Sequence, residues 1–107
     1  MNTLELREWA VKNDIEKRTI KGFWNYYNNF LEEDSETFYS IYGKLEQEMI
    51  CVKLSKVALT IVNWPDDYVN DCIIAYASIK YDDINIAEYK LVFNLVGEIV
   101  DDYLLPD

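Results

Sequence analysis

Histidine is absent from this chain, which removes the commonest general base and the commonest metal ligand of proteins. Glycine is scarce, because Gly22, Gly43 and Gly97 are scattered and form no phosphate-binding loop. The only two cysteines, Cys51 and Cys72, make neither a disulfide framework nor a paired zinc spacing, and we expect both to be reduced and buried. No nucleophile-elbow motif is present. These absences predict a protein without catalytic activity, metal or cofactor.

Long apolar runs are also lacking. No stretch approaches the roughly 20 residues that a membrane-spanning helix needs, and residues 1–7 lack the apolar centre of a secretory signal peptide. Hydrophobic residues still make up 50% of the chain and aromatic residues 15%, which is typical of a folded core. At this length we expect a single domain, residues 1–107, located in the cytoplasm and not bound to a membrane.

Basic residues are too few to balance the acids, and the net charge is −10. Residues 1–30 hold four acids and five bases, whereas residues 31–107 hold sixteen acids and only five lysines. Lysine and arginine contacts to phosphate supply much of the affinity for nucleic acid, so this distribution argues against direct nucleic-acid binding. It favours a basic partner, or serves solubility alone.

Carboxylates are the one abundant kind of side-chain group here that could take part in catalysis or bind a metal ion. Two acids could serve a hydrolase, and Asp66, Asp67 and Asp71 offer oxygen ligands to calcium. Their spacing lacks the glycine of an EF-hand loop, and acids in turns are far more often solvated surface. We therefore rank an enzyme or a calcium site below a binding protein.

The C-terminal half predicts strands joined by acidic turns. Residues 72–81 and 88–96 alternate with the period of two that a half-buried strand needs, and residues 82–85 supply a turn between them. Gly97 takes a positive φ cheaply and marks a turn before a last strand at 99–105. Upstream, residues 57–62 are mostly β-branched, which favours another strand, and the residues that follow are typical of a turn. Residues 50–54 are either a separate strand or the end of a helix.

The N-terminal half predicts two or three helices. Thr3 can cap the first, and Asp34 or Ser35 can cap the third. Gly22 lies inside the second and costs about 1 kcal/mol relative to alanine. The expected buried faces are Leu6, Trp9 and Ala10; then Ile15, Thr19, Phe23, Tyr27 and Phe30 or Leu31; then Phe38, Ile41, Tyr42, Leu45 and Met49. Helices first and strands afterwards indicate an α+β domain, with the helices packed on an antiparallel four- to five-stranded β-meander.

The connection 64–71 is the first candidate binding region. Alternate turns of a meander lie at the same end of the sheet, so this loop should neighbour the turn at Gly97. It is either a polar turn whose aspartates cap backbone amides or a patch of aromatic anchors among carboxylates that meets a basic protein surface. The candidate partner-binding residues here are Trp64, Asp66, Asp67, Tyr68, Asp71 and Glu98.

A second acidic cluster lies between the second and third expected helices and comprises Glu32, Glu33, Asp34 and Glu36. The preceding aromatic segment, residues 23–30, predicts one buried helix face. Trp24 and Tyr26 fall off that face, which is where interface anchors would stand.

The segment Tyr89–Leu104 (YKLVFNLVGEIVDDYL) resembles the closing hairpin of many small bacterial immunity proteins, which partner polymorphic or contact-dependent growth-inhibition toxins. It covers about a sixth of the chain, and Val96 stands where those hairpins usually have Asp or Asn before the glycine. The resemblance implies a cytoplasmic, non-enzymatic protein that binds one toxin domain, often a cationic nuclease. It implies no particular binding residues.

Our leading hypothesis is therefore an acidic inhibitor that neutralises a basic toxin protein, most plausibly a nuclease domain, by occlusion. Its carboxylates would occupy the positions that nucleic-acid phosphates take. The alternatives are a structural or adaptor subunit that forms a homodimer through a sheet edge or its aromatic helices, and a phage-type nucleic-acid mimic with the same charge logic.

Overall fold

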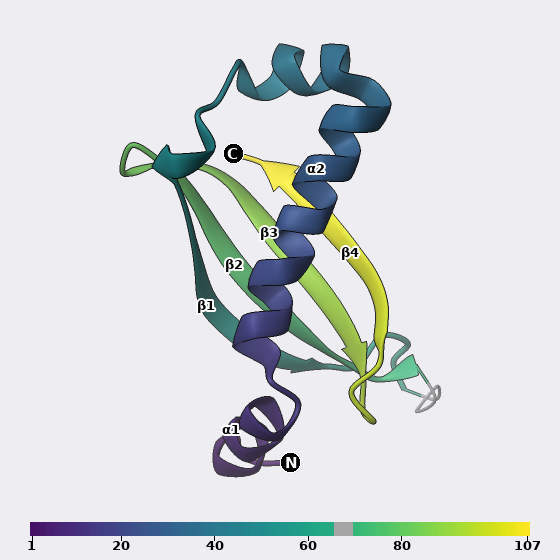
Figure 1. Ribbon diagram of the computed structural model, residues 1–107. Helices are drawn as coiled ribbons and strands as arrows, with labels where there is room; N and C mark the ends of the chain where they lie inside the picture. Colours follow the sequence, from purple (N-terminus) through teal and green to yellow (C-terminus); the bar gives the residue numbers. More distant parts are fainter. Residues whose placement is uncertain (66–69) are drawn as a thin grey trace.

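The computed structural model describes residues 1–65 and 70–107 (Figure 1). In chain order the elements are α1 (Thr3–Lys12), α2 (Ile15–Tyr42), a short 3-10 helix (Gln47–Met49), β1 (Ile50–Thr60), β2 (Cys72–Tyr81), β3 (Ile84–Asn94) and β4 (Ile99–Pro106). The strands form one antiparallel sheet in the order β1-β2-β3-β4, and α2 lies across one of its faces (Figure 1). The expected α+β fold, with helices on a meander, is confirmed.

The first strand settles whether the sheet has four or five members. Residues 50–54 are strand and not helix end, and they continue into the segment around Val57 as one strand, β1. The register shifts between Leu54 and Lys56, which leaves Ser55 in a bulge whose hydroxyl donates to the Tyr76 carbonyl at 3.0 Å. A bulge bends a strand without ending it, so the described sheet has four strands. The predicted extension to residue 62 was wrong, because β1 ends at Thr60.

The turn between β2 and β3 is tighter than predicted. Asp82 and Asp83 both take positive φ, 50° and 64°, which is the geometry of a two-residue hairpin turn. Tyr81 pairs directly with Ile84, so β3 begins four residues before the expected position 88. Short polar side chains tolerate this left-handed region. The turn predicted at Gly97 is confirmed, with φ of 92°.

Helix α1 is capped by Asn2 and not by Thr3. The Asn2 side chain accepts from the Glu5 amide at 2.8 Å, and the Glu5 carboxylate accepts from the Asn2 amide, so the two form a capping box. The Trp9 indole donates to the Leu95 carbonyl at 2.9 Å, and its ring meets Phe93 edge-on at 6.0 Å. These contacts hold α1 against the end of the sheet where β3 turns into β4.

Helix α2 consists of two helical segments separated by a kink at Asp34, whose φ of −153° and ψ of 67° are not helical. The Asp34 carboxylate accepts from the Thr37 amide at 3.1 Å and from its hydroxyl at 2.7 Å, which is a cap for the second segment. Of the two predicted caps, Asp34 and Ser35, the structure therefore confirms Asp34. Ile41 and Met49 were wrongly assigned to the core, since they are 47% and 39% exposed.

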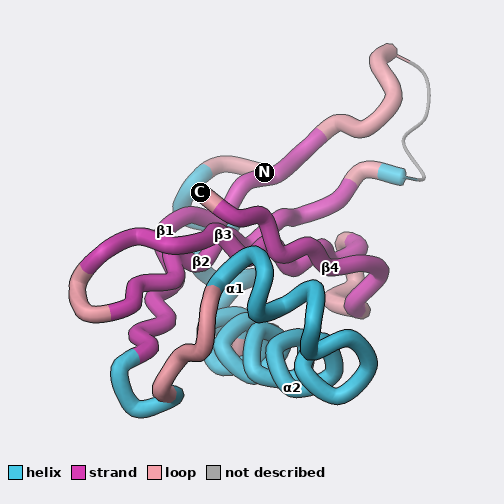
Figure 2. Tube along the Cα trace, turned by 90° about the horizontal axis from the view of Figure 1, so that it is seen from above, coloured by secondary structure: helices cyan, strands magenta, loops and turns pink. Residues whose placement is uncertain are grey.

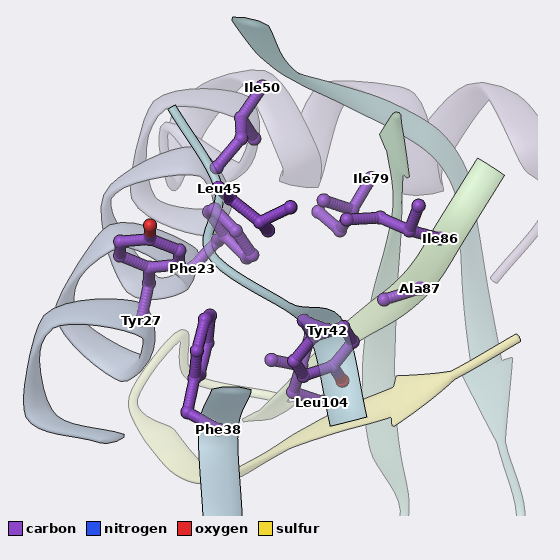
Figure 3. Close-up of a pocket in the computed structure, with 10 residues that line it drawn as sticks. All are labelled: Phe23, Tyr27, Phe38, Tyr42, Leu45, Ile50, Ile79, Ile86, Ala87 and Leu104. Carbon is purple, nitrogen blue, oxygen red and sulfur yellow. The ribbon is translucent and has the colours of Figure 1, made fainter. Parts of the chain in front are cut away.

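The core lies between α2 and the sheet. Ile15, Thr19, Phe23 and Tyr27 are buried along the first segment, as predicted, and Phe38 is buried on the second. Figure 3 shows the rings of Phe23, Tyr27 and Phe38 gathered where the two segments meet the sheet. The void they line has a volume of about 10 Å³, which is about the space for one water. This part of the core therefore holds no small-molecule site.

Candidate binding groove between α2 and β4

A groove of about 510 Å³ opens at the surface where α2 passes over the edge strand β4. Its residues come from the first helical segment, from the kink and from one position of β4. They combine carboxylates, carboxamides and aromatic rings, and they are Asn25, Tyr26, Asn29, Phe30, Glu33, Asp34 and Asp102.

Asp102 enters the groove because of the sheet register. It pairs with Leu91, which is buried on the side of the sheet that α2 covers, so Asp102 faces α2 as well. The buried Tyr89 hydroxyl donates to the Asp102 carboxylate at 2.7 Å. Burial, and then this hydrogen bond, raise the pKa of Tyr89, so the phenol stays protonated and remains a donor at neutral pH.

Glu33 and Asp34 reach the groove from the kink in α2. Hydrogen bonds from the Thr37 side chain and then its amide lower the pKa of Asp34, so this carboxylate is ionised at neutral pH. The cap that breaks the helix therefore also fixes an anion at the rim of the groove.

Aromatic rings form the apolar part of the groove. Tyr26 lies edge-on to Phe30, with ring centroids 6.3 Å apart, and edge-on to Tyr89 at 6.2 Å. The carboxamides of Asn25 and Asn29 add neutral hydrogen-bonding groups from the same helix. Carboxylates beside aromatic rings are the surroundings that a guanidinium or ammonium group prefers.

The groove carboxylates keep their charge available. The hydrogen-bond donors that the structure records for the Asp34 and Asp102 carboxylates, in Thr37 and Tyr89, are uncharged. Among the described residues that line the groove, none is a lysine or arginine. The groove therefore presents an uncompensated negative charge to a ligand.

Two of the residues predicted as partner-binding line this groove and two do not. Glu33 and Asp34 belong to it, whereas Glu32 and Glu36 are exposed on α2 and do not line it. Asp102 was missed. The alternation of β4 could have placed it on the same face as Leu104, but only the path of α2 brings it to Asp34.

The described residues of the other predicted cluster lie near the start of β4. β1 ends and β2 begins at the end of the sheet where β3 turns into β4 (Figure 1). Trp64 is 81% exposed, and Asp71 keeps one buried carboxylate oxygen without a hydrogen-bond partner in the described chain. Glu98 is hydrogen-bonded through its amide and carboxylate to the Asn94 side chain. Asp66, Asp67 and Tyr68 lie outside the described residues, so this binding cluster stays a prediction.

Within residues 1–65 and 70–107, no three cysteine, aspartate or glutamate residues gather in a way that could hold a metal ion. None of the helices in the same ranges combines the length and apolarity required to cross a bilayer.

Because of the tyrosines in and beside α2, we expect the protein to lose stability at alkaline pH. Burial raises the pKa of Tyr27, Tyr42 and Tyr89 above the usual value of about 10. The unfolded chain ionises first, so their contribution is complete below pH of about 10 and is lost as the pH rises further. Urea midpoints should be flat from about pH 7 to 9 and fall above 10. The urea midpoint of the Tyr89→Phe variant should fall less steeply as the pH rises. An unchanged slope in this variant would contradict the assignment of the pH effect to Tyr89.

Comparison with known proteins yields no match from which a function could be inferred. The chain matches no family model, and neither the curated proteins nor the solved structures gave a match.

Proposed function

We propose that this protein is a non-enzymatic inhibitor that binds a basic protein through the groove between α2 and β4. The observation that carries this proposal is the convergence of Glu33, Asp34 and Asp102 beside the rings of Tyr26 and Phe30. An arginine or lysine of the partner would enter the groove, with its charge at the carboxylates and its apolar stem against the rings.

The overall charge supports the same mode of binding. At a net charge of −10, the protein attracts a cationic partner before contact, which raises the association rate by roughly 10–10³-fold at low salt. Glu32 and Glu36 lie beside the groove in sequence and would add to this field. Specificity then rests on the shape of the groove, because long-range attraction alone does not distinguish one basic protein from another.

Within this class, we favour a toxin domain as the partner, most plausibly a nuclease. The hairpin that resembles bacterial immunity proteins supplies Asp102, the one groove residue from the sheet, and Tyr89, whose hydroxyl donates to the Asp102 carboxylate. A nuclease binds phosphates with basic side chains. Carboxylates of the inhibitor that bind those basic side chains would keep the nucleic-acid substrate out without any chemical step.

The test uses a deca-arginine peptide as a probe and three protein forms. In the groove variant, Glu33→Gln, Asp34→Asn and Asp102→Asn remove three charges while keeping side-chain size and the asparagine-compatible cap. The control variant Glu8→Gln, Glu46→Gln and Glu48→Gln removes three exposed carboxylates that do not line the groove. Stopped-flow association at roughly 50 and 200 mM salt should be about tenfold slower for the groove variant, with a weaker salt dependence.

The control variant should stay within about twofold of the unmodified protein. Equal slowing in both variants would show that only net charge matters and would overturn the groove assignment. The toxin assignment is tested separately, by inhibition of a panel of cationic nuclease domains. Binding of deca-arginine without inhibition of any nuclease would overturn the toxin assignment and leave the groove as a binding site for another basic protein.

The adaptor alternative makes a different prediction. A homodimer through the outer edge of β4 would bring Asp101 and Asp102 of two chains close together, and this like-charge contact disfavours such pairing. A solution mass equal to two chains would support the adaptor, and a mass of one chain would support the inhibitor. A nucleic-acid mimic shares the charge logic and differs only in the partner, which would be a host DNA-binding protein.

A further inference from the structure

The face of the sheet turned away from α2 carries a charge opposite to that of the molecule as a whole. Figure 2 shows α2 on one side of the strands only. Side chains alternate along a strand, so the neighbours of the buried β2 residues point to the other side. Four of the five lysines in residues 31–107 stand at such positions, and we call this surface the lysine face: Lys53, Lys56, Lys80 and Lys90 around Tyr76.

Two of these lysines flank one tyrosine. The register aligns Lys56 with Tyr76, Tyr76 with Lys90, and Lys90 with Tyr103, so lysine and tyrosine alternate across all four strands. Lys56 Nζ lies 4.1 Å from the centroid of the Tyr76 ring, and Lys90 Nζ lies 5.4 Å from it. These cation–π contacts hold two ammonium groups at the Tyr76 ring instead of leaving them to move freely in solvent.

Acids are outnumbered on this face. Glu88 and Asp101 are on the same side of the sheet, and the Tyr103 hydroxyl donates to Asp101 at 2.6 Å. Four ammonium groups against two carboxylates make this face net positive in a protein whose total charge is −10.

A hollow of about 290 Å³ adjoins the lysine face at the β1 bulge, between β1 and α1. Arg7 and Lys56 are among the residues that line it, Leu6 and Val57 are among its apolar residues, and none of the described lining residues carries a carboxylate. The bulge at Ser55 shapes this hollow because it bends β1 beside α1. Its chemistry suits a carboxylate on a short apolar stem, as in a glutamate side chain.

We propose that the lysine face and this hollow bind an acidic segment of a partner polypeptide. One glutamate or aspartate of the segment would enter the hollow between Arg7 and Lys56, and further carboxylates would meet Lys90 and its neighbours. This surface is separate from the groove between α2 and β4, so the inference stands without the proposed function.

The charge of the molecule decides which anion fits. Nucleic acid, an anionic membrane or a second copy of this chain would each bring a large negative charge against a protein that already carries −10. A short polypeptide segment interacts only within a screening distance of about 8 Å, where the lysines dominate. Ammonium groups also already lie over the Tyr76 ring, which leaves it poorly placed to stack on a base.

The test is a titration of the isotope-labelled protein, followed by amide NMR, with a twelve-residue peptide of alternating glutamate and leucine. Shifts should map to Arg7, Lys56, Tyr76 and Lys90. In the double variant Lys56→Glu/Lys90→Glu, the dissociation constant for the peptide should rise at least about tenfold, as expected for the loss of close charge pairs. Lys12→Glu/Lys17→Glu changes the net charge equally at exposed helical positions and should leave binding within about threefold.

The amide spectrum of each variant reports whether it is folded, and Lys56→Gln/Lys90→Gln provides a milder form if charge reversal disturbs the sheet. No shifts on the lysine face at millimolar peptide, or equal losses in the two charge-reversed variants, would overturn the proposal. Tighter binding to oligodeoxythymidine or to phosphatidylserine vesicles than to the peptide would overturn the choice of an acidic polypeptide. Deca-arginine binding in the groove should be retained in Lys56→Gln/Lys90→Gln, so failure here is distinguishable from failure of the proposed function.

Discussion

Replacement of Phe38 by alanine should lower the free energy of unfolding by about 3–5 kcal/mol, a large share of the total for a domain of this size. Phe38 is 1% exposed, and its ring meets those of Tyr27 at 5.1 Å, Phe30 at 5.3 Å and Tyr42 at 5.0 Å. It is the buried residue of the helical segment after the kink. Alanine would open a cavity in a part of the core whose void now measures only about 10 Å³.

Urea denaturation followed by circular dichroism measures this loss, with Tyr39→Ala as the matched control. Tyr39 is the next residue along α2, is 42% exposed and contacts Phe38 and Lys44. Its removal should cost about 1 kcal/mol or less. Phe38→Leu keeps most of the side-chain volume and should cost under about 2 kcal/mol, so it remains measurable if Phe38→Ala does not fold. Similar losses for Phe38→Ala and Tyr39→Ala would contradict the packing role assigned to Phe38.

The second large effect is expected at Gly22, where alanine should destabilise the protein by about 1–3 kcal/mol. Helix propensity alone predicts the opposite, a gain of about 1 kcal/mol. A Cβ atom at Gly22 would lie 2.6 Å from the Tyr89 hydroxyl oxygen and 3.4 Å from Leu91. Tyr89 is fully buried and hydrogen-bonded to Asp102, so its ring cannot move aside without loss of that bond.

A double-mutant cycle isolates this contact. Tyr89→Phe deletes the hydroxyl that a Cβ at position 22 would meet. In the Tyr89→Phe background, Gly22→Ala should therefore cost at least about 1 kcal/mol less than in the unmodified protein. Equal costs in both backgrounds would show that the hydroxyl is not the obstacle, and a stabilising Gly22→Ala would show that propensity outweighs packing.

The two effects bear on the groove as well as on stability. Gly22 lets α2 approach β3 closely enough for the Tyr89 hydroxyl to lie under the helix and donate to Asp102. Phe38 holds the segment whose cap is Asp34. The relative positions of the groove carboxylates therefore depend on helix-to-sheet packing at both points.

Local patterns were sufficient for much of the fold. The period of two in residues 72–81 predicted β2 with its observed bounds, because strand alternation is set by neighbouring residues. The cap at Asp34 was predictable for the same reason. The misplaced start of β3 arose because Asp82 and Asp83 both adopt left-handed conformations, which propensity assigns mainly to glycine and asparagine.

The binding sites were harder to predict from local sequence patterns. Glu33 and Asp34 were candidates because acids cluster there, but Asp102 joins them only through the β3–β4 register and the path of α2. The lysines of the later half were counted only as a minority charge. Their gathering around Tyr76 depends on the pairing of three strands.

The amino-acid sequence by itself determined the order of helices and strands, the faces they bury and the excess of negative charge. Each of these depends on composition or on residues within a few positions of one another. Only the tertiary structure decided that α2 covers one face of the sheet, that it passes close to Tyr89 at Gly22, and that four lysines gather on the opposite face. Those outcomes depend on contacts between residues far apart in the chain, whose register and packing no local periodicity specifies.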